Sequence, residues 1–452
     1  MQGIGSHRRF FDRIHHSLTS TALLLGAFIV GSNAQAQQPS NPPSSHGRAE
    51  APATTPHLGT PTALRELVRE AEQQNPQLAA SFHAWQAARN APAQVSALPE
   101  TQVFVQQFAV GSPRPFSGYS NSDFAYIGFG ASQDFPYPGK RPLRAQVAQY
   151  EAHAMEAQTD SVRRTLIGNL KLTYFRLAYI QQTLEVLERN DDVLRQVEQA
   201  AEARYRVGQG NQQDVLKAQL QHTKILQEIA HHHEQEGMLE AQLKQLVGRA
   251  QDSADIDTET LTRRRLSYSA ADLLQKVREQ NPDVRSKQAA IQAQTTQVEL
   301  AHKNSRPDFN LAYTYERTGS QSRDYYMGTF GIRLPNRGRQ KAELAEAQQK
   351  QQQARRELDS ELQRVLSEVQ QQYVQAKTSE ERLEIYEEGL VPQSQATFRS
   401  ALAAYQSNRQ DFGSLLSSFL DVLNLDLEYR SEIADHESAL AQLESLTGIE
   451  IP

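Results

Sequence analysis

One segment of the chain, Lys140–Arg206, contains no glycine or proline except Pro142 and Gly168. Pro142 lies in the first turn, where a proline is tolerated because the backbone N–H groups there have no helical partner. At 1.5 Å per residue the segment predicts a single helix about 100 Å long, far longer than the helices of ordinary globular domains. A chain with such a helix must build an elongated structure whose apolar surface forms a narrow seam.

The same segment carries a seam of this kind. Its members recur mostly at spacings of four and three residues, which is the pattern of a coiled coil. They are Leu166, Leu170, Thr173, Leu177, Ile180, Leu184, Leu187 and Leu194. Only 38% of the chain is hydrophobic and the mean hydropathy is -0.64, which favours long helices over several compact cores. A second long helix is expected over residues 339–407, and shorter helices over 76–97, 212–247, 282–304 and 411–446.

The landmarks of the sequence occur twice in the same order, 199 to 206 positions apart. The pairs are Asn75-Pro76 and Asn281-Pro282, Phe129-Gly130 and Phe330-Gly331, Pro136 and Pro335, Gly139 and Gly338, Tyr205 and Tyr405, and Gly248 and Gly448. This repeat is too long for a solenoid unit, so we interpret it as a duplicated half-protein. The first copy covers residues 61–250, the second covers 268–452, and 251–267 is a linker.

Each copy contains two short stretches of alternating polarity, which predicts strands over residues 101–110, 123–135, 308–317 and 324–334. The alternation is clearest in the second copy, whereas the first copy is noisier. In the second copy the apolar and aromatic residues share one face, and polar residues such as Asn310, Thr314 and Arg333 lie opposite. The residues expected to face lipid are Phe309, Leu311, Tyr313, Tyr315, Phe330, Ile332 and Leu334.

Strands of about ten residues with one apolar face match those that cross a bilayer in a β-barrel. A small sheet packed on a helix is the alternative, but the predicted helices leave no spare apolar face to cover it. Four strands cannot close a barrel, and an open edge in lipid leaves backbone groups unsatisfied. Two chains would supply eight strands around a filled interior, and three would supply twelve around a lumen. We therefore expect a mainly α fold with membrane β, in which a helical coiled-coil barrel continues a shared, trimeric, twelve-stranded β-barrel.

The first 36 residues have the form of a secretory signal, with a basic start, an apolar run and the small residues Ala34 and Ala36. The pair Arg8-Arg9 leaves open the general or the twin-arginine route. Residues 37–60 are rich in proline, serine and threonine, which predicts a disordered leader. The chain has no cysteine, which excludes disulfides and a lipid-carrying N-terminal cysteine. The formal net charge of -6 does not suggest a nucleic-acid partner.

A short phrase beginning with tyrosine follows each long helix: YRVGQGNQQDVLKAQ from Tyr205 and YQSNRQDFGSLLSSF from Tyr405. Glycine and asparagine provide the turns, over residues 207–212 and 408–411. Asp214 and Asp411 fall at or near the start of the returning helix, where a carboxylate complements the helix dipole. Both phrases are therefore expected to form hairpin tips at one end of the helices.

With these tandem halves, strand pairs and tip phrases, residues 62–448 resemble the outer-membrane efflux protein family, the TolC-like channels. The resemblance implies a homotrimer in the outer membrane with a large periplasmic portion, and tips that meet a periplasmic adaptor and an inner-membrane pump. It implies tip contacts for Tyr205, Val207, Gly208, Asp214, Leu216, Tyr405, Asn408, Asp411 and Leu416. The tunnel-entrance candidates are Asp411, Ser414 and Ser417, where the two serines replace acidic residues of some members. No enzyme activity and no cofactor are expected, and the cargo, whether drugs, metal ions or proteins, stays open.

Two alternatives accompany this interpretation. A soluble periplasmic coiled-coil adaptor or scaffold would carry the same helices without a pore. The run His231-His232-His233 suggests a metal site, yet consecutive helical residues point about 100° apart and cannot converge on one ion within a chain. We expect a solvated or intersubunit face there and assign no metal, and a site of three equivalent histidines across a trimer axis is the alternative. No nucleophile or paired carboxylates occur at catalytic spacing.

Overall fold

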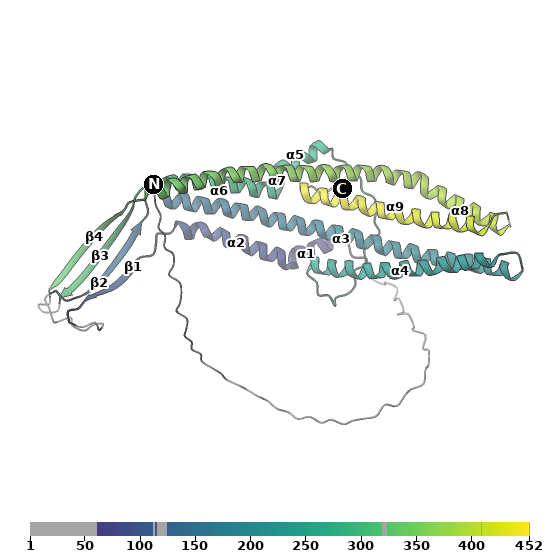
Figure 1. The fold of residues 1–452 in the computed structure, drawn as a ribbon, viewed down its shortest axis with the longest axis horizontal. Coiled ribbons are helices and arrows are strands. Elements are labelled where there is room, and N and C mark those ends of the chain that lie inside the picture. Colours follow the sequence, from purple (N-terminus) through teal and green to yellow (C-terminus); the bar gives the residue numbers. More distant parts are fainter. Residues whose placement is uncertain (1–60, 112–113, 115–123, 319–322, 408, 452) are drawn as a thin grey trace, which may run out of the picture. The chain divides into compact units, whose positions relative to one another are not determined.

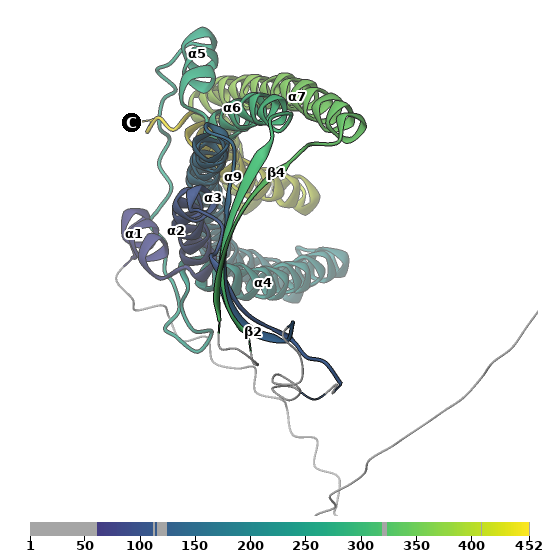
Figure 2. The ribbon, with the colours of Figure 1, turned by 90° about the vertical axis from the view of Figure 1, so that its left-hand side faces the viewer.

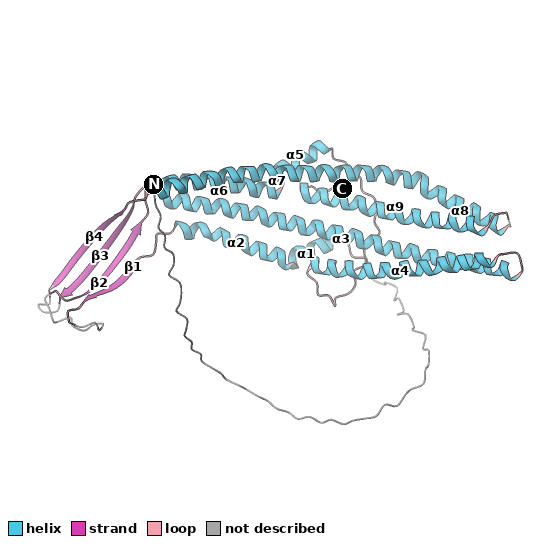
Figure 3. Ribbon diagram, in the orientation of Figure 1, coloured by secondary structure: helices cyan, strands magenta, loops and turns pink. Residues whose placement is uncertain are grey.

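The computed structural model describes residues 61–111, 114, 124–318, 323–407 and 409–451, all within one unit, His57–Pro452. The expected signal sequence, the leader and Asn408 lie outside the described residues. Helices dominate the described part, and four strands form the only sheet in it (Figure 3).

Helix α3, Lys140–Arg206, is the central element and has the bounds expected from the sequence. It packs against α2 (Pro76–Ser96), α4 (Gln212–Val247), α6 (Pro282–Lys303) and α9 (Phe412–Thr447), which lie beside it in Figure 1. Gly168 permits one of these contacts, because a Cβ there would come within 3.0 Å of the Ser445 hydroxyl on α9. Among the described helices, none is both long and apolar enough to cross a membrane.

The second long helix runs without a break close to the expected 339–407, but one π turn interrupts its α-helical hydrogen bonding. Helix α7 covers Arg337–Ile385, a π turn covers Tyr386–Leu390, and α8 covers Val391–Gln406. The N–H of Val391 donates to the carbonyl oxygen of Tyr386, five residues back. Pro392 explains the interruption, because a proline lacks an N–H and its ring collides with the carbonyl four residues earlier. The sequence analysis overlooked this proline.

Two eleven-residue helices, α1 (Leu64–Gln74) and α5 (Ala270–Gln280), were not expected. Each ends at an asparagine, Asn75 or Asn281, that also caps the next helix. The side-chain oxygen of each asparagine accepts two backbone N–H groups, and its Nδ2 donates to the carbonyl of Leu246 at 2.9 Å or of Leu446 at 3.0 Å. Each side chain thus caps the start of one helix and bonds to the last turn of another, while the backbone N–H of the same asparagine closes the short helix before it.

The four strands form one antiparallel sheet in the order β1-β2-β3-β4 (Figure 2). Their bounds are Gln102–Phe108, Tyr126–Phe135, Asp308–Thr318 and Asp324–Arg333. The two expected hairpins are joined because β2 pairs with β3 along its whole length, from Tyr126 opposite Thr318 to Phe135 opposite Phe309. Within the described chain β1 and β4 are the outer strands, and each pairs on one side only.

The register separates the sheet into two unlike faces. Residues paired across the strands share a face, so Leu311 lies beside Phe330, and Phe309 beside Ile332. That face is apolar and open, with Leu311 53% and Phe330 64% exposed. The opposite face is polar: the Gln106 amide donates to Glu316 at 2.7 Å, and Asp134 accepts from the Asn310 amide and from Arg333.

Three clusters of buried side chains fill the spaces between the helices, and α3 contributes to two of them. The linker between the halves is held by Arg264, whose guanidinium donates to Glu437 at 2.6 Å and to Glu444 at 2.9 Å. Both carboxylates are almost fully buried, at 2% and 8% exposed. Removing one member of such a network is costly because an unpaired charge would stay buried.

The two asparagine joints provide a test of this packing. We expect Asn75→Ala or Asn281→Ala to lower the free energy of unfolding by about 2 kcal/mol, because each loses a helix cap and a bond to a buried carbonyl. Asn90→Ala is the matched control, since its exposed amide bonds only to Gln86 within the same helix. Equal denaturation midpoints for all three variants would contradict the assignment.

The helical tips as the candidate functional site

The first tip closes with a left-handed glycine. After α3 ends at Arg206, Gly208 adopts a φ of 74° and its N–H donates to the Tyr205 carbonyl at 3.0 Å. The N–H of Gln209 donates to the Arg204 carbonyl at 2.8 Å, which completes a Schellman motif. Only glycine adopts a positive φ without steric strain, which explains why Gly208 occupies this position.

The returning helix α4 is capped by Asn211, whose side chain accepts the Gln213 N–H at 3.3 Å. Asp214, half-exposed in the first turn, is therefore not the cap, although its charge still complements the helix dipole. In the second tip the cap is Asp411, which accepts the backbone N–H of Ser414 at 3.0 Å and its hydroxyl at 3.2 Å. These two bonds hold the pKa of Asp411 below the ordinary aspartate range.

The two tips are joined by a contact between the halves of the chain. The Arg204 guanidinium lies over the Tyr405 ring, 4.4 Å from its centroid, and Nη1 donates to the Tyr405 carbonyl at 2.8 Å. Phe412 meets the same ring edge-on, with 5.8 Å between centroids. Tyr405 is consequently 4% exposed, and burial raises the pKa of its phenol.

The two tips differ in what they expose. Around the first tip Tyr205, Val207 and Leu216 are 46%, 68% and 56% exposed. In the second tip Tyr405 is buried and Leu416 is half-buried, packed against the cluster that joins both hairpins. The corresponding tyrosines therefore occupy unlike environments, although the sequence analysis treated them alike. The entrance candidates Asp411, Ser414 and Ser417 are all exposed.

The remaining candidates lie outside the two tips, on the sheet and further along α4. Among the residues expected to face lipid, Leu311, Tyr313, Phe330 and Ile332 are exposed on the apolar face, Phe309 and Tyr315 are half-buried, and Leu334 follows β4 and is 79% exposed. On α4, His232 and His233 each contact the side chain three residues further on, Gln235 or Glu236. No group of three or more potential metal ligands is gathered anywhere in the part of the chain that the structure describes.

Arg204 is the residue that the sequence analysis missed. It lies directly before the tyrosine of the first phrase, but its partner is 201 positions away, and no local pattern marks it. An arginine at the end of a long amphipathic helix is ordinary. Only the packing of both α3 and α8 against α9 brings it to Tyr405.

Long paired helices that end in two hairpin tips, joined at their other end to a four-stranded antiparallel sheet, define the architecture of outer-membrane efflux channels. A model of the family described as "Outer membrane efflux protein" matches residues 67–249 and 273–443. The chain belongs to this family, which consists of channel proteins rather than enzymes.

Solved structures show the same fold. The chain is similar to the outer-membrane channel OprN, with 17% identity, 85% of this chain and 89% of that chain covered, and a TM-score of 0.74. It is similar to CusC, with 18% identity, coverages of 85% and 91%, and a TM-score of 0.74. For VceC from Vibrio cholerae the identity is 20%, the coverages are 86% and 97%, and the TM-score is 0.73. No curated protein gives a significant sequence match.

The Asp411 cap generates a prediction for acid pH. A carboxyl group with a lowered pKa stabilises the fold fully above its unfolded pKa of about 3.9, and the contribution is lost as the pH falls through the folded pKa. We therefore expect amide-exchange protection in the first turn of α9, corrected for intrinsic rates, to be constant above about pH 4 and to fall below it.

Two variants distinguish the cap from general acid unfolding. Asp411→Asn keeps an acceptor for the Ser414 N–H and is expected to remove the pH dependence, whereas Asp411→Ala is expected to lower protection at every pH. The first turn of α2, capped by Asn75 and without an acidic residue, serves as the internal control. Identical acid profiles for Asp411→Asn and the unmodified chain would disprove the role of this carboxylate.

Proposed function

We propose that this chain is the outer-membrane channel of a tripartite efflux or secretion system. In this proposal three copies pool their strands into a twelve-stranded barrel, and their helices continue it as a periplasmic tunnel. An inner-membrane pump delivers the cargo through a periplasmic adaptor, and the channel conducts it passively. Selection of the cargo therefore lies with the pump, and the wide tube needs no recognition of its own.

The observation that carries this proposal is the sheet with one exposed apolar face and two open edges. Each free edge of β1 and β4 presents backbone N–H and carbonyl groups, and each such group costs several kcal/mol if it stays unpaired in lipid. Pairing β4 of one copy with β1 of the next removes both edges when three copies form a ring. The polar face, with its carboxylates, amides and Arg333, then suits a water-filled lumen.

The tips are the proposed adaptor-binding region. Exposed apolar side chains rimmed by polar residues mark protein interaction sites, and the first tip offers Tyr205, Val207 and Leu216. Gly208 supports this surface by fixing the turn. Tyr405, Asp411 and Leu416 are proposed to shape the second tip from within, and Asp411, Ser414 and Ser417 to line the tunnel entrance.

We also interpret the two halves of the chain as copies of one ancestral unit. The matching asparagine joints at Asn75 and Asn281, and the left-handed glycines Gly248 and Gly448 that end α4 and α9, support this interpretation. Three chains would then present six similar units around the tunnel.

The channel is tested by assembly and conductance. The purified full chain is expected to require detergent, to migrate as a heat-modifiable trimer, and to form discrete conducting events in a planar bilayer. Extraction of a single-chain protein by carbonate, with no conductance, would instead support the soluble coiled-coil adaptor.

Neighbouring residues on β4 test which face meets lipid. Phe330→Asp places a charge on the apolar face and is expected to destabilise the inserted trimer by about 2 kcal/mol, whereas Thr329→Asp faces the polar side and is expected to be tolerated. The measurement is the temperature at which the trimer dissociates. A larger loss for Thr329→Asp would reverse the assignment of the faces.

The docking surface is tested by charge substitution at the first tip. Val207→Asp and Leu216→Asp are each expected to weaken binding of the purified trimer to the periplasmic adaptor of the same cell about tenfold, because a carboxylate would be buried in an apolar contact. Met238→Asp is the matched control, since Met238 is 62% exposed and lies on α4 like Leu216, but 22 positions further from the tip. Equal losses for all three variants would exclude a specific contact at the tip.

A further inference from the structure

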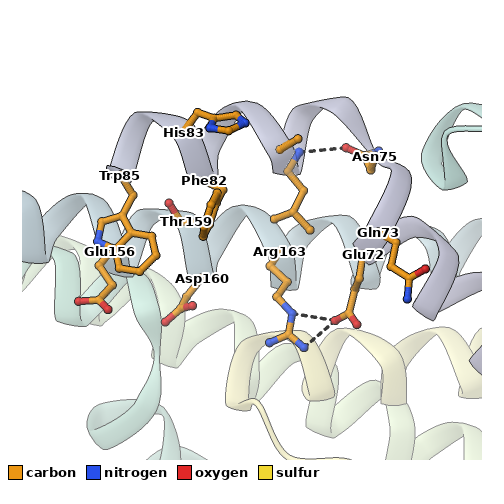
Figure 4. Close-up of a pocket in the computed structure, with 12 residues that line it drawn as sticks. Glu72, Gln73, Asn75, Phe82, His83, Trp85, Glu156, Thr159, Asp160 and Arg163 are labelled. Atoms are coloured by element: carbon orange, nitrogen blue, oxygen red, sulfur yellow. Dashed lines mark hydrogen bonds and ion pairs between the residues drawn. The ribbon is translucent and has the colours of Figure 1, made fainter. Parts of the chain in front are cut away.

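A groove lies between α2 and α3, beside the end of α1. It encloses about 550 Å³, which is within the range of small-molecule sites. Figure 4 shows Phe82 and Trp85 of α2 directed toward the part of α3 that carries Glu156 and Asp160. Neither the tips nor the sheet contributes to this groove, so it is separate from the proposed adaptor-binding region and from the strands of the proposed barrel.

Two aromatic side chains of α2, Phe82 and Trp85, form one wall of the groove. Phe82 and Trp85 meet edge-on, with 5.5 Å between ring centroids, and Phe82 is nevertheless 44% exposed. The Arg89 guanidinium lies over the Trp85 ring, 5.2 Å from its centroid. This indole therefore already engages one cation from its own helix, an interaction that its electron-rich ring favours.

The charge of the groove is negative once its own ion pairs are considered. Arg163, the one guanidinium in the lining, is bound to Glu72 at 2.6 Å, as the dashed lines in Figure 4 show. The ion pairs of Glu156 and Asp160 are exposed and longer, to His153 at 3.5 Å and to Arg285 at 3.4 Å, and Asp160 also lies near the Arg164 guanidinium. Such surface pairs contribute little and are easily exchanged for another cation.

We propose that this groove binds an organic cation with an aryl body. The aromatic pair and Leu78 provide apolar contact for the body, and the carboxylates of Glu156 and Asp160 face the positive centre. A single arginine side chain from a partner protein would fill only a small part of the volume, so a free small molecule is the better occupant. The site requires neither assembly with an adaptor nor an open channel.

The chain supplies its own reporter, because Trp85 is its single tryptophan. Methyltriphenylphosphonium is added to the detergent-solubilised full chain and the tryptophan emission is followed. Triphenylphosphine oxide, a neutral molecule of similar shape, is the ligand control. We expect a saturable change with the cation and binding about tenfold weaker with the neutral molecule, since one to two charge contacts are lost.

Variants assign the binding to the groove. Glu156→Gln combined with Asp160→Asn is expected to weaken binding about tenfold, and Phe82→Ala about fivefold. The control carries Glu346→Gln and Asp359→Asn, which remove two exposed carboxylates of α7 outside the groove. Calorimetry repeats the titration with Trp85→Phe, which removes the reporter but keeps an aromatic wall.

Four results would overturn the proposal: no saturable change, equal affinity for the neutral molecule, unchanged affinity in the groove variants, or binding that appears only with a second protein present. A trimer that conducts ions but fails these titrations would refute the groove alone. A chain that binds the cation but forms no channel would refute only the proposed function.

Discussion

The packing of other helices along α3 is the interaction on which the rest of the described structure depends. Five helices, α1, α2, α4, α6 and α9, contact it, and two of the three buried clusters include its side chains. Because α3 is uninterrupted, the spacing between sheet and tip is set by one rigid element with a rise of about 1.5 Å per residue. Every residue discussed at the tips takes its place relative to the sheet from this helix.

Contacts between the halves give each half a different role. Arg204 from the first half covers Tyr405 of the second, and Arg264 of the linker is anchored on carboxylates of α9. The second tip is consequently closed over a buried aromatic cluster, whereas the first presents apolar side chains to its surroundings. The two similar sequence phrases therefore form a packed second tip and a first tip with exposed apolar side chains.

Local patterns in the sequence predicted the elements whose causes are local. The near absence of glycine and proline predicted the bounds of α3, the alternation around Phe309 and Phe330 identified the strands of the second half, and Asp411 was expected near the start of α9. The short helix α1 was missed although Leu64, Leu67, Val68 and Ala71 recur at helical spacing, so the signal was present in the sequence. The pairing of β2 with β3 and the burial of Tyr405 depend on residues about 200 positions apart, and a single sequence contains no trace of such contacts.

The π turn in the second long helix has a consequence for how the two halves correspond. Gly139 and Gly338, just before the two long helices or at their start, are 199 positions apart, whereas Tyr205 and Tyr405 near their ends are 200 apart. The second half is therefore one residue longer between these landmarks, and the π turn Tyr386–Leu390 lies within that stretch. The helix continues through this turn to Gln406, so the second tip is carried by a helical path about as long as that of α3.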